Sequence, residues 1–118
     1  MDISDFEKLA AKAIRRLPRE FRARLDNVIV TVKAAPTKAQ VSRFGSGLLG
    51  LYEGVPLSER GTSYSGALPD KITLFKDNIE AADGDEAAVA DRIRHTVMHE
   101  IAHHFGMDDD ELREKGLY

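Results

Sequence analysis

The chain has 118 residues, of which 42% are hydrophobic and 31% are charged, with a formal net charge of -3 and no cysteine. This composition is typical of an ordinary soluble globular protein and excludes a disordered or fibrous chain, and the length predicts a single domain over residues 1–118. The absence of cysteine excludes disulfides, thiolate metal ligands and cysteine nucleophiles, so histidine and carboxylate side chains must hold any metal.

The first predicted element is a helix that ends at Pro18. Ser4 and Glu7 have the spacing of a capping box, and apolar residues then recur at helical intervals up to the proline. Residues 19–25 fit a further short helical turn. Lysine and arginine are concentrated in this part of the chain. We interpret them as solvated helix faces, because the overall acidity argues against a nucleic-acid partner.

Three segments have the pattern of β-strands. Residues 27–32, NVIVTV, form an alternating β-branched run, residues 48–57 fit a second strand or hairpin arm, and residues 71–79, KITLFKDNI, fit another strand. We expect a loop over residues 34–47, which contain a proline and two glycines and show little periodicity. Residues 58–70 are rich in turn-forming residues.

The longest predicted element is a helix that ends at Gly106. Asp83 and Glu86 have capping-box spacing before it, and the residues that follow favour helix strongly. Apolar residues recur at every fourth position along it, and they are Val89, Ile93, Val97 and Ile101. A second apolar stripe consists of Met98, Ala102 and Phe105. This pattern predicts a largely buried central helix of about five to six turns.

His99, Glu100 and His103 form the pattern H-E-x-x-H near the end of that helix. Residues four apart lie on one face of a helix, so the two imidazoles can bind one ion, with the carboxylate beside them as a general base. Gly106 suits a left-handed helix exit, which turns the following chain back toward the metal. Asp109 is then a candidate third ligand that leaves a fourth position open for water. The alternative is a polar helix end without a metal.

The extended pattern H-E-x-x-H-x-x-G-x-x-D resembles that of the zincin-like metallopeptidases, and in particular their small single-domain bacterial members. The resemblance implies that His99, His103 and Asp109 bind zinc and that Glu100 is the catalytic base. With the predicted elements, it implies an α+β, zincin-like fold: a small mixed sheet of three or four strands, an N-terminal helix, a central metal-binding helix and a short C-terminal helix. The chain departs from the metzincins, because too few residues follow Asp109 for their methionine turn.

The aspartates after Gly106 have a second possible role. Any aspartate in the segment DDDE can cap a last short helix, and Asp108 has capping-box spacing to Glu111. We favour Asp108 as the cap and Asp109 as the ligand, because the metzincin spacing is met by Asp109 alone.

Other histidines and the tyrosines near the motif are further candidates. His104 points about 100° away from the preceding histidine, and we expect it to interact with the helix dipole. His95 lies one turn before the motif on the same face; we expect a surface or packing residue, with support of the metal ligands as the alternative. Three tyrosines are candidate oxyanion donors or ordinary packing residues: Tyr52, Tyr64 and Tyr118.

The motif predicts a zinc-dependent peptidase that hydrolyses a peptide or protein substrate, with Glu100 as general base to a metal-activated water. The strand around residues 72–76 offers an edge for an extended peptide. The alternatives are a metal-binding or peptide-interaction module with little or no turnover, and a regulatory protease for a single cellular protein. The start MDISDFEKLA lacks the pattern of a secretory signal and no run of about 18 apolar residues is present, which predicts a cytoplasmic protein without a membrane partner.

Overall fold

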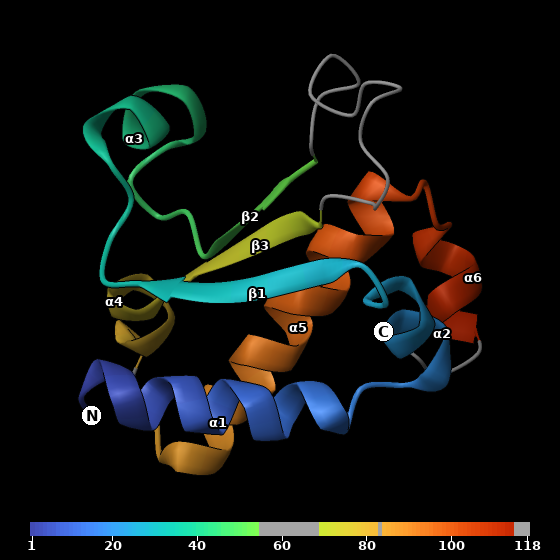
Figure 1. Ribbon diagram of the computed structural model, residues 1–118, viewed down its shortest axis with the longest axis horizontal. Coiled ribbons are helices and arrows are strands. Elements are labelled where there is room, and N and C mark those ends of the chain that lie inside the picture. Colours follow the sequence, from blue (N-terminus) through green and yellow to red (C-terminus); the bar gives the residue numbers. More distant parts are fainter. Residues whose placement is uncertain (55–68, 83, 115–118) are drawn as a thin grey trace.

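The computed structural model describes residues 1–54, 69–82 and 84–114, without the side chains of Asp109, Glu111 and Leu112. Over these ranges the elements in chain order are α1 (Ile3–Arg15), α2 (Arg19–Arg24), β1 (Val28–Lys33), α3 (Lys38–Phe44), β2 (Gly50–Glu53), β3 (Asp70–Phe75), α4 (Lys76–Glu80), α5 (Glu86–His104) and α6 (Asp109–Glu114) (Figure 1). Every helix in this described part is too short or too polar to cross a membrane.

The strands form a three-stranded mixed sheet in the order β1-β3-β2. β1 runs parallel to β3, with Val30 opposite Ile72, and β2 runs antiparallel to β3, with Tyr52 opposite the same isoleucine. The structure therefore confirms the α+β class with a small mixed sheet, an N-terminal helix, a long central helix and a short C-terminal helix.

The predicted substrate edge at residues 72–76 is wrong, because β3 is the central strand and is hydrogen-bonded on both sides. Its side chains from Ile72 to Phe75 are all buried, as expected for a strand that is covered on both faces. Among the described strands, β1 and β2 form the edges of the sheet.

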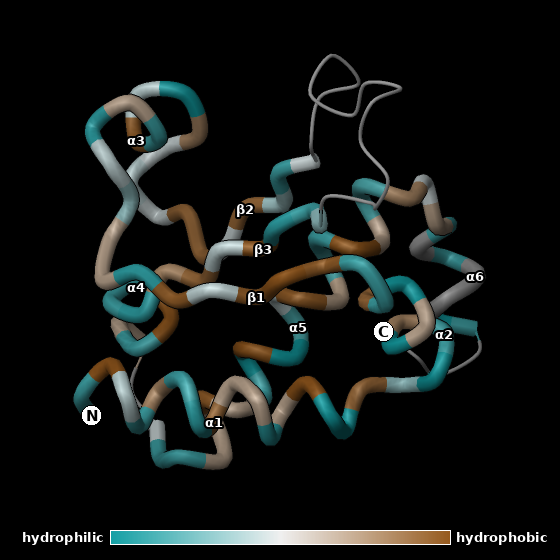
Figure 2. The backbone as a smooth tube through the Cα atoms, in the orientation of Figure 1, coloured by the Kyte–Doolittle hydropathy of each residue, from teal (hydrophilic) through white to brown (hydrophobic). Residues whose placement is uncertain are grey.

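The core lies between one face of the sheet and the helices α1 and α5, and Figure 1 shows α5 running beneath the strands with α1 alongside it. The first apolar stripe predicted for the central helix is buried, with exposed fractions of 0% at Ile93, Val97 and Ile101 and 5% at Val89. Of the second predicted stripe, Met98 and Ala102 are buried, whereas Phe105 is 39% exposed. The first stripe belongs to one cluster with buried side chains of α1 and β3, which are Phe6, Ala10, Ala13, Ile72 and Leu74. In Figure 2, α1 alternates between hydrophobic and hydrophilic residues, as a helix with one buried face must.

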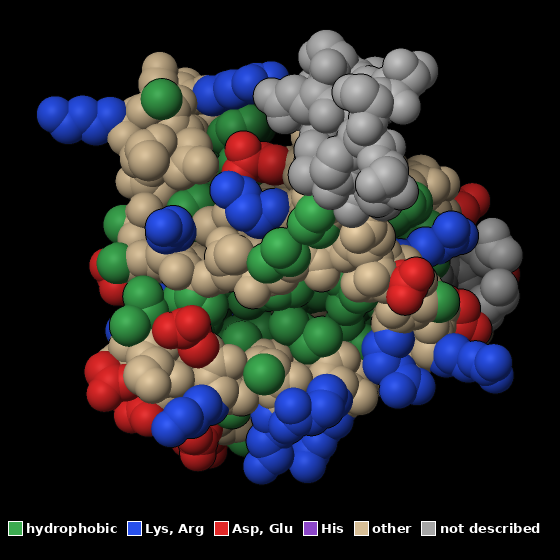
Figure 3. Space-filling view, viewed as in Figure 1, with side chains coloured by type: hydrophobic (Ala, Val, Ile, Leu, Met, Phe, Trp, Pro, Cys, Tyr) green, Lys and Arg blue, Asp and Glu red, His purple; other side chains and the backbone are tan. Residues whose placement is uncertain are grey.

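The basic residues of the N-terminal part lie on exposed helix faces, as the sequence predicts. The lysine and arginine side chains of α1 and α2, together with the intervening Arg16, are all exposed. Figure 3 shows lysine and arginine side chains gathered over these two helices. The short helical turn predicted for residues 19–25 is α2.

Two predictions about local structure are wrong. The expected loop over residues 34–47 contains α3, whose start is closed by a full capping box between Thr37 and Gln40. The expected strand over residues 71–79 ends at Phe75, and α4 follows directly. A capping box within a segment that also carries proline and glycine favours a short helix between turns, which a search for long periodicity does not detect.

The helix caps also differ from the sequence expectation. α1 is capped by Asp2 instead of Ser4, and the Asp2 carboxylate accepts a hydrogen bond from the Asp5 N–H at 2.8 Å. α5 is capped by Asp85, which accepts from the Ala88 N–H at 3.0 Å. The predicted cap Asp83 lies outside the described residues, as do most of the turn-rich segment 58–70 and the end of segment 48–57.

Candidate metal centre

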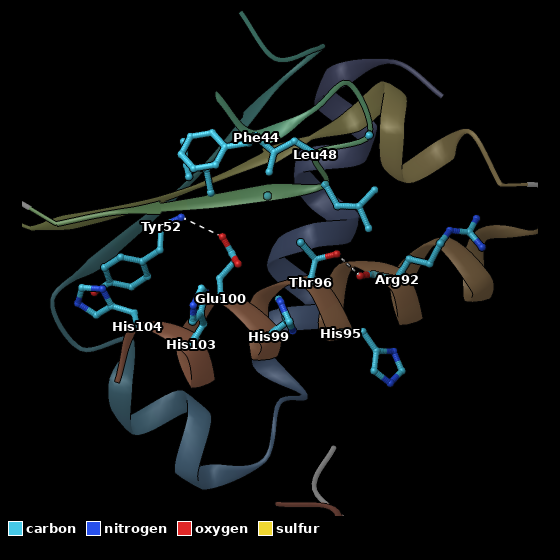
Figure 4. Close-up of a pocket in the computed structure, with 14 residues that line it drawn as sticks. Phe44, Leu48, Tyr52, Arg92, His95, Thr96, His99, Glu100, His103 and His104 are labelled. Atoms are coloured by element: carbon cyan, nitrogen blue, oxygen red, sulfur yellow. Dashed lines mark hydrogen bonds between the residues drawn. The ribbon is translucent and has the colours of Figure 1, made fainter. Parts of the chain in front are cut away.

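His99 and His103 lie one turn apart on α5, and both side chains are exposed. Their ring centroids are 6.2 Å apart, with the ring planes tilted by 44°. Two imidazoles that share a tetrahedral zinc ion, at Zn–N distances of about 2.1 Å, hold their ring centroids about 5 Å apart. A side-chain rotation that shortens the distance between the ring centroids by about 1 Å would therefore let both rings bind one ion. Figure 4 shows the two rings beside Glu100 on α5.

The helix exit has the geometry that the glycine predicts. Gly106 has a φ of 64°, in the left-handed region that favours glycine. The Met107 N–H donates to the Ala102 carbonyl at 2.8 Å, and the Gly106 N–H donates to the His103 carbonyl at 3.4 Å. These two bonds form a Schellman motif, which ends α5 and redirects the chain immediately after the two histidines.

The third predicted ligand, Asp109, is the first residue of α6, but its side chain lies outside the described part of the structure. Asp108 behaves as a helix cap, since its Oδ1 accepts a hydrogen bond from the Asp110 N–H at 2.9 Å. Among the side chains that are described, no three histidine, aspartate or glutamate residues are grouped closely enough to hold a metal ion. The role of Asp109 therefore stays a prediction.

Glu100 reaches from α5 to the neighbouring strand β2. Its Oε1 accepts a hydrogen bond from the Tyr52 backbone N–H at 3.2 Å (Figure 4). Burial raises the pKa of the Glu100 carboxyl above its ordinary value, while the Tyr52 N–H and the charges of His99 and His103 partly oppose this rise. A carboxylate with a raised pKa is a stronger proton acceptor, which suits a general base.

Tyr52 is fixed by contacts that the sequence does not predict. Its hydroxyl donates to Asp70 Oδ2 at 2.7 Å, and its ring stacks on His104 with centroids 3.8 Å apart and planes 17° apart. His104 is the last residue of α5, where an interaction with the helix dipole stays a prediction, and its ring also contacts β2 through this stack. Asp70 carries no motif that marks it in the sequence, because its contact arises only when two strands pair. The other candidate tyrosines, Tyr64 and Tyr118, lie outside the described residues.

Gly50 is the reason that β2 lies so close to α5. A Cβ atom at this position would lie 2.7 Å from Thr96 Cγ2 and 3.3 Å from the Thr73 carbonyl oxygen. Any larger residue would push the strand away from the helix. The close approach at Gly50 places the following turn of α5 beneath Tyr52, where Glu100 reaches the strand.

The motif residues open into a cleft of about 1040 Å³. One wall is formed by Phe44 and residues 47–52, and the floor is formed by α5 residues, which are Arg92, His95, Thr96, His99, Glu100, His103 and His104. His95 is exposed, and its Nδ1 lies 2.9 Å from the Asp91 carbonyl oxygen. Its ring points away from Glu100 in Figure 4, in agreement with the expected surface position.

The comparison with protein families bears on the whole of this arrangement. A family model described as zincin-like metallopeptidase matches residues 25–117, which include all the described strands, the cleft and the H-E-x-x-H helix. No curated protein matches the chain in sequence. Because the family match extends over most of the chain, the protein belongs to the zincin-like metallopeptidase family.

Proposed function

We propose that the protein is a zinc-dependent metallopeptidase that hydrolyses bonds in a peptide or protein substrate. His99, His103 and Asp109 are the proposed zinc ligands, and Glu100 is the proposed general base. The observation that carries the proposal is that His99, Glu100 and His103 line one open cleft bounded by an edge strand. Membership of the family supports it further.

The donor set suits zinc, which prefers imidazole and carboxylate ligands where thiolates are absent. Zinc, when bound, supplies a Lewis acid that polarises the scissile carbonyl and lowers the pKa of the attacking water. Glu100 would accept a proton from the attacking water and donate it to the leaving amine as the carbon–nitrogen bond breaks. The burial that raises the Glu100 pKa assists the first of these roles, because it makes the carboxylate a stronger base toward the attacking water.

The outer edge of β2 is the proposed seat of the substrate backbone. The Leu49 carbonyl accepts a hydrogen bond from the Phe75 N–H at 2.9 Å, so the backbone groups of Leu49 and of every second residue after it point toward β3. The backbone groups of Gly50 and Tyr52 therefore point toward the outer edge. An extended peptide can add to this edge at Gly50, next to the cleft.

The test is the variant Glu100→Gln in zinc-loaded protein. We expect peptide hydrolysis to fall by at least about 100-fold, the lower end of the contribution of general-base catalysis, while bound zinc stays at the wild-type amount. Cleavage of a peptide library and metal analysis of the same samples measure the two quantities, with chelator-treated wild type as the control. Undiminished hydrolysis by the variant would refute the assigned role of Glu100.

The second candidate is a metal-binding or peptide-interaction module with little turnover. The observation that favours it is the hydrogen bond between Glu100 and Tyr52, which engages the proposed base with the strand. Such a module binds zinc and peptides, but its wild type shows no chelator-sensitive cleavage in the same library. A regulatory protease for a single protein gives the same negative result on the library and differs by cleaving its one substrate.

A further inference from the structure

The contact between Tyr52 and Glu100 joins two elements that are far apart in the sequence. Glu100 lies on α5 and Tyr52 lies on β2, and the bond runs from the Tyr52 N–H to Glu100 Oε1 at 3.2 Å. This N–H takes no part in sheet pairing. The backbone groups that bond to β3 belong to Leu49 and to every second residue after it, and Tyr52 is not one of these. The donor therefore points out of the sheet edge toward the helix, where it meets the carboxylate.

The Tyr52 side chain is held from two directions. Its hydroxyl donates to Asp70 Oδ2 at 2.7 Å, and Asp70 is itself fixed at the start of β3, where its N–H donates to the Asn27 carbonyl at 3.0 Å. On the helix side, the His104 ring stacks on the Tyr52 ring at 3.8 Å. One contact fixes the tyrosine to the sheet, and the other fixes it to the last turn of α5.

We propose that Tyr52, Asp70 and His104 form a tyrosine clamp that positions Glu100 for catalysis. Asp70 and His104 hold the Tyr52 ring, the ring fixes the local backbone of β2, and the Tyr52 N–H holds one oxygen of the Glu100 carboxylate. Restricting that carboxylate leaves its other oxygen to exchange the proton in the cleft, so the reactive geometry is set before the substrate binds. The catalytic part of this inference rests on the proposed peptidase function.

The clamp also separates the roles of two adjacent histidines. His103 and His104 are successive helical residues, so their side chains diverge by about 100°. The His104 ring stacks on the Tyr52 ring at 3.8 Å, so it points away from the proposed metal site between His99 and His103. His104 is therefore a positioning residue of the clamp and not a metal ligand.

The test compares His104→Ala with His104→Phe, which keeps a stacking ring. Aromatic stacking contributes about 1 kcal/mol, so we expect His104→Ala to speed hydrogen exchange of the Tyr52 amide about fivefold, and to lower kcat by a similar factor. KM and zinc affinity should stay within about twofold of wild type, since the altered side chain binds neither substrate nor metal. His104→Phe should restore both the exchange rate and kcat. If the ring had only a structural role, His104→Ala would not lower kcat while leaving KM unchanged.

Three further variants test the clamp by hydrogen exchange alone, without a measurement of enzymatic turnover. Glu100→Ala removes the acceptor and should expose the Tyr52 amide at least as fully as His104→Ala. Tyr52→Phe removes only the hydroxyl contact with Asp70 and should raise exchange by a smaller factor, which keeps the test intact if His104→Ala does not fold. His95→Ala removes another exposed histidine of the cleft and should leave the Tyr52 amide unchanged.

The exchange arm is run on both zinc-loaded and metal-free protein, which separates the clamp from the proposed function. If exchange follows the pattern above and the wild type has no peptidase activity, the clamp stands and the proposed function fails. If the Tyr52 amide exchanges at the wild-type rate in Glu100→Ala, His104→Ala and Tyr52→Phe, or if His104→Phe is no better than His104→Ala, the clamp is overturned.

Discussion

The two faces of α5 differ sharply in their exposure to solvent. One face carries the apolar stripe from Val89 to Ile101, whose members have exposed fractions of 0% to 5%. The other carries His95, His99 and His103, which are all exposed and open into the cleft. This difference shows that the two faces of one helix have separate roles. The face toward α1 and β3 contributes stability, and the face toward β2 carries the residues of the proposed chemistry.

This division has a physical advantage for a metal site. Ligands on an exposed surface have mobile side chains, and a weak site results when their backbone also moves. Here the backbone beneath the histidines is fixed by the buried stripe on the opposite face. If the division is real, substitutions on one face should leave the property of the other face unchanged.

The largest effect is expected from Ile93→Ala on the buried face. Ile93 is fully buried, and removing three carbon atoms from such a site costs about 2 to 5 kcal/mol in the free energy of unfolding. Urea denaturation measures this loss, and Ile93→Val should cost only about 0.5 to 1.5 kcal/mol. Zinc affinity of the folded fraction should equal that of the wild type. A large loss of zinc affinity in folded Ile93→Ala would show that the two faces are coupled.

The next effect is expected from His103→Ala on the cleft face. Loss of residues that merely support metal ligands lowers metal affinity about 10- to 100-fold, so loss of this proposed ligand should lower zinc affinity by more than about 100-fold. The side chain is exposed, so the unfolding free energy of the metal-free protein should change by no more than about 0.5 kcal/mol. Competition with a zinc chelator measures the affinity.

His95→Ala is the matched control for that experiment, because it removes an exposed histidine from the same helix and the same cleft. It should leave zinc affinity unchanged. Equal losses in the two variants would mean that the zinc ligands are not those of the H-E-x-x-H motif.

Both faces of α5 could be predicted from the sequence because both are properties of a single helix. The four-residue spacing of the apolar stripe and of His99 and His103 fixes their faces as soon as the segment is helical. The left-handed exit at Gly106 was equally local, since only glycine adopts that conformation at little cost. The role of Asp109 depends on where the returning chain places a side chain, and no local pattern fixes that position.

The part that could not be predicted lies where α5 meets the sheet. Tyr52 and Glu100 are 48 positions apart, and their contact depends on strand order, register and the distance between helix and sheet. No sequence pattern indicates that the strand within KITLFKDNI is the central one, because an apolar run of that length fits an edge or a centre equally well. Misplacing that strand also misplaced the predicted substrate edge, since β3 is central and β2 is an edge among the described strands.

The smallest of these effects is expected from Gly50→Ala, where β2 approaches the cleft side of α5 most tightly against Thr96. The added Cβ would lie 2.7 Å from Thr96 Cγ2, so strand and helix must separate, at a cost of about 1 to 3 kcal/mol in unfolding free energy. Thr96→Ser removes the opposing methyl but keeps the hydroxyl that donates to the Arg92 carbonyl. The double variant should therefore lose less stability than the sum of the two single changes, and a double-mutant cycle in urea measures that coupling. Additive losses would mean that Gly50 and Thr96 do not set the spacing, and the position of Glu100 beneath Tyr52 would then need another cause.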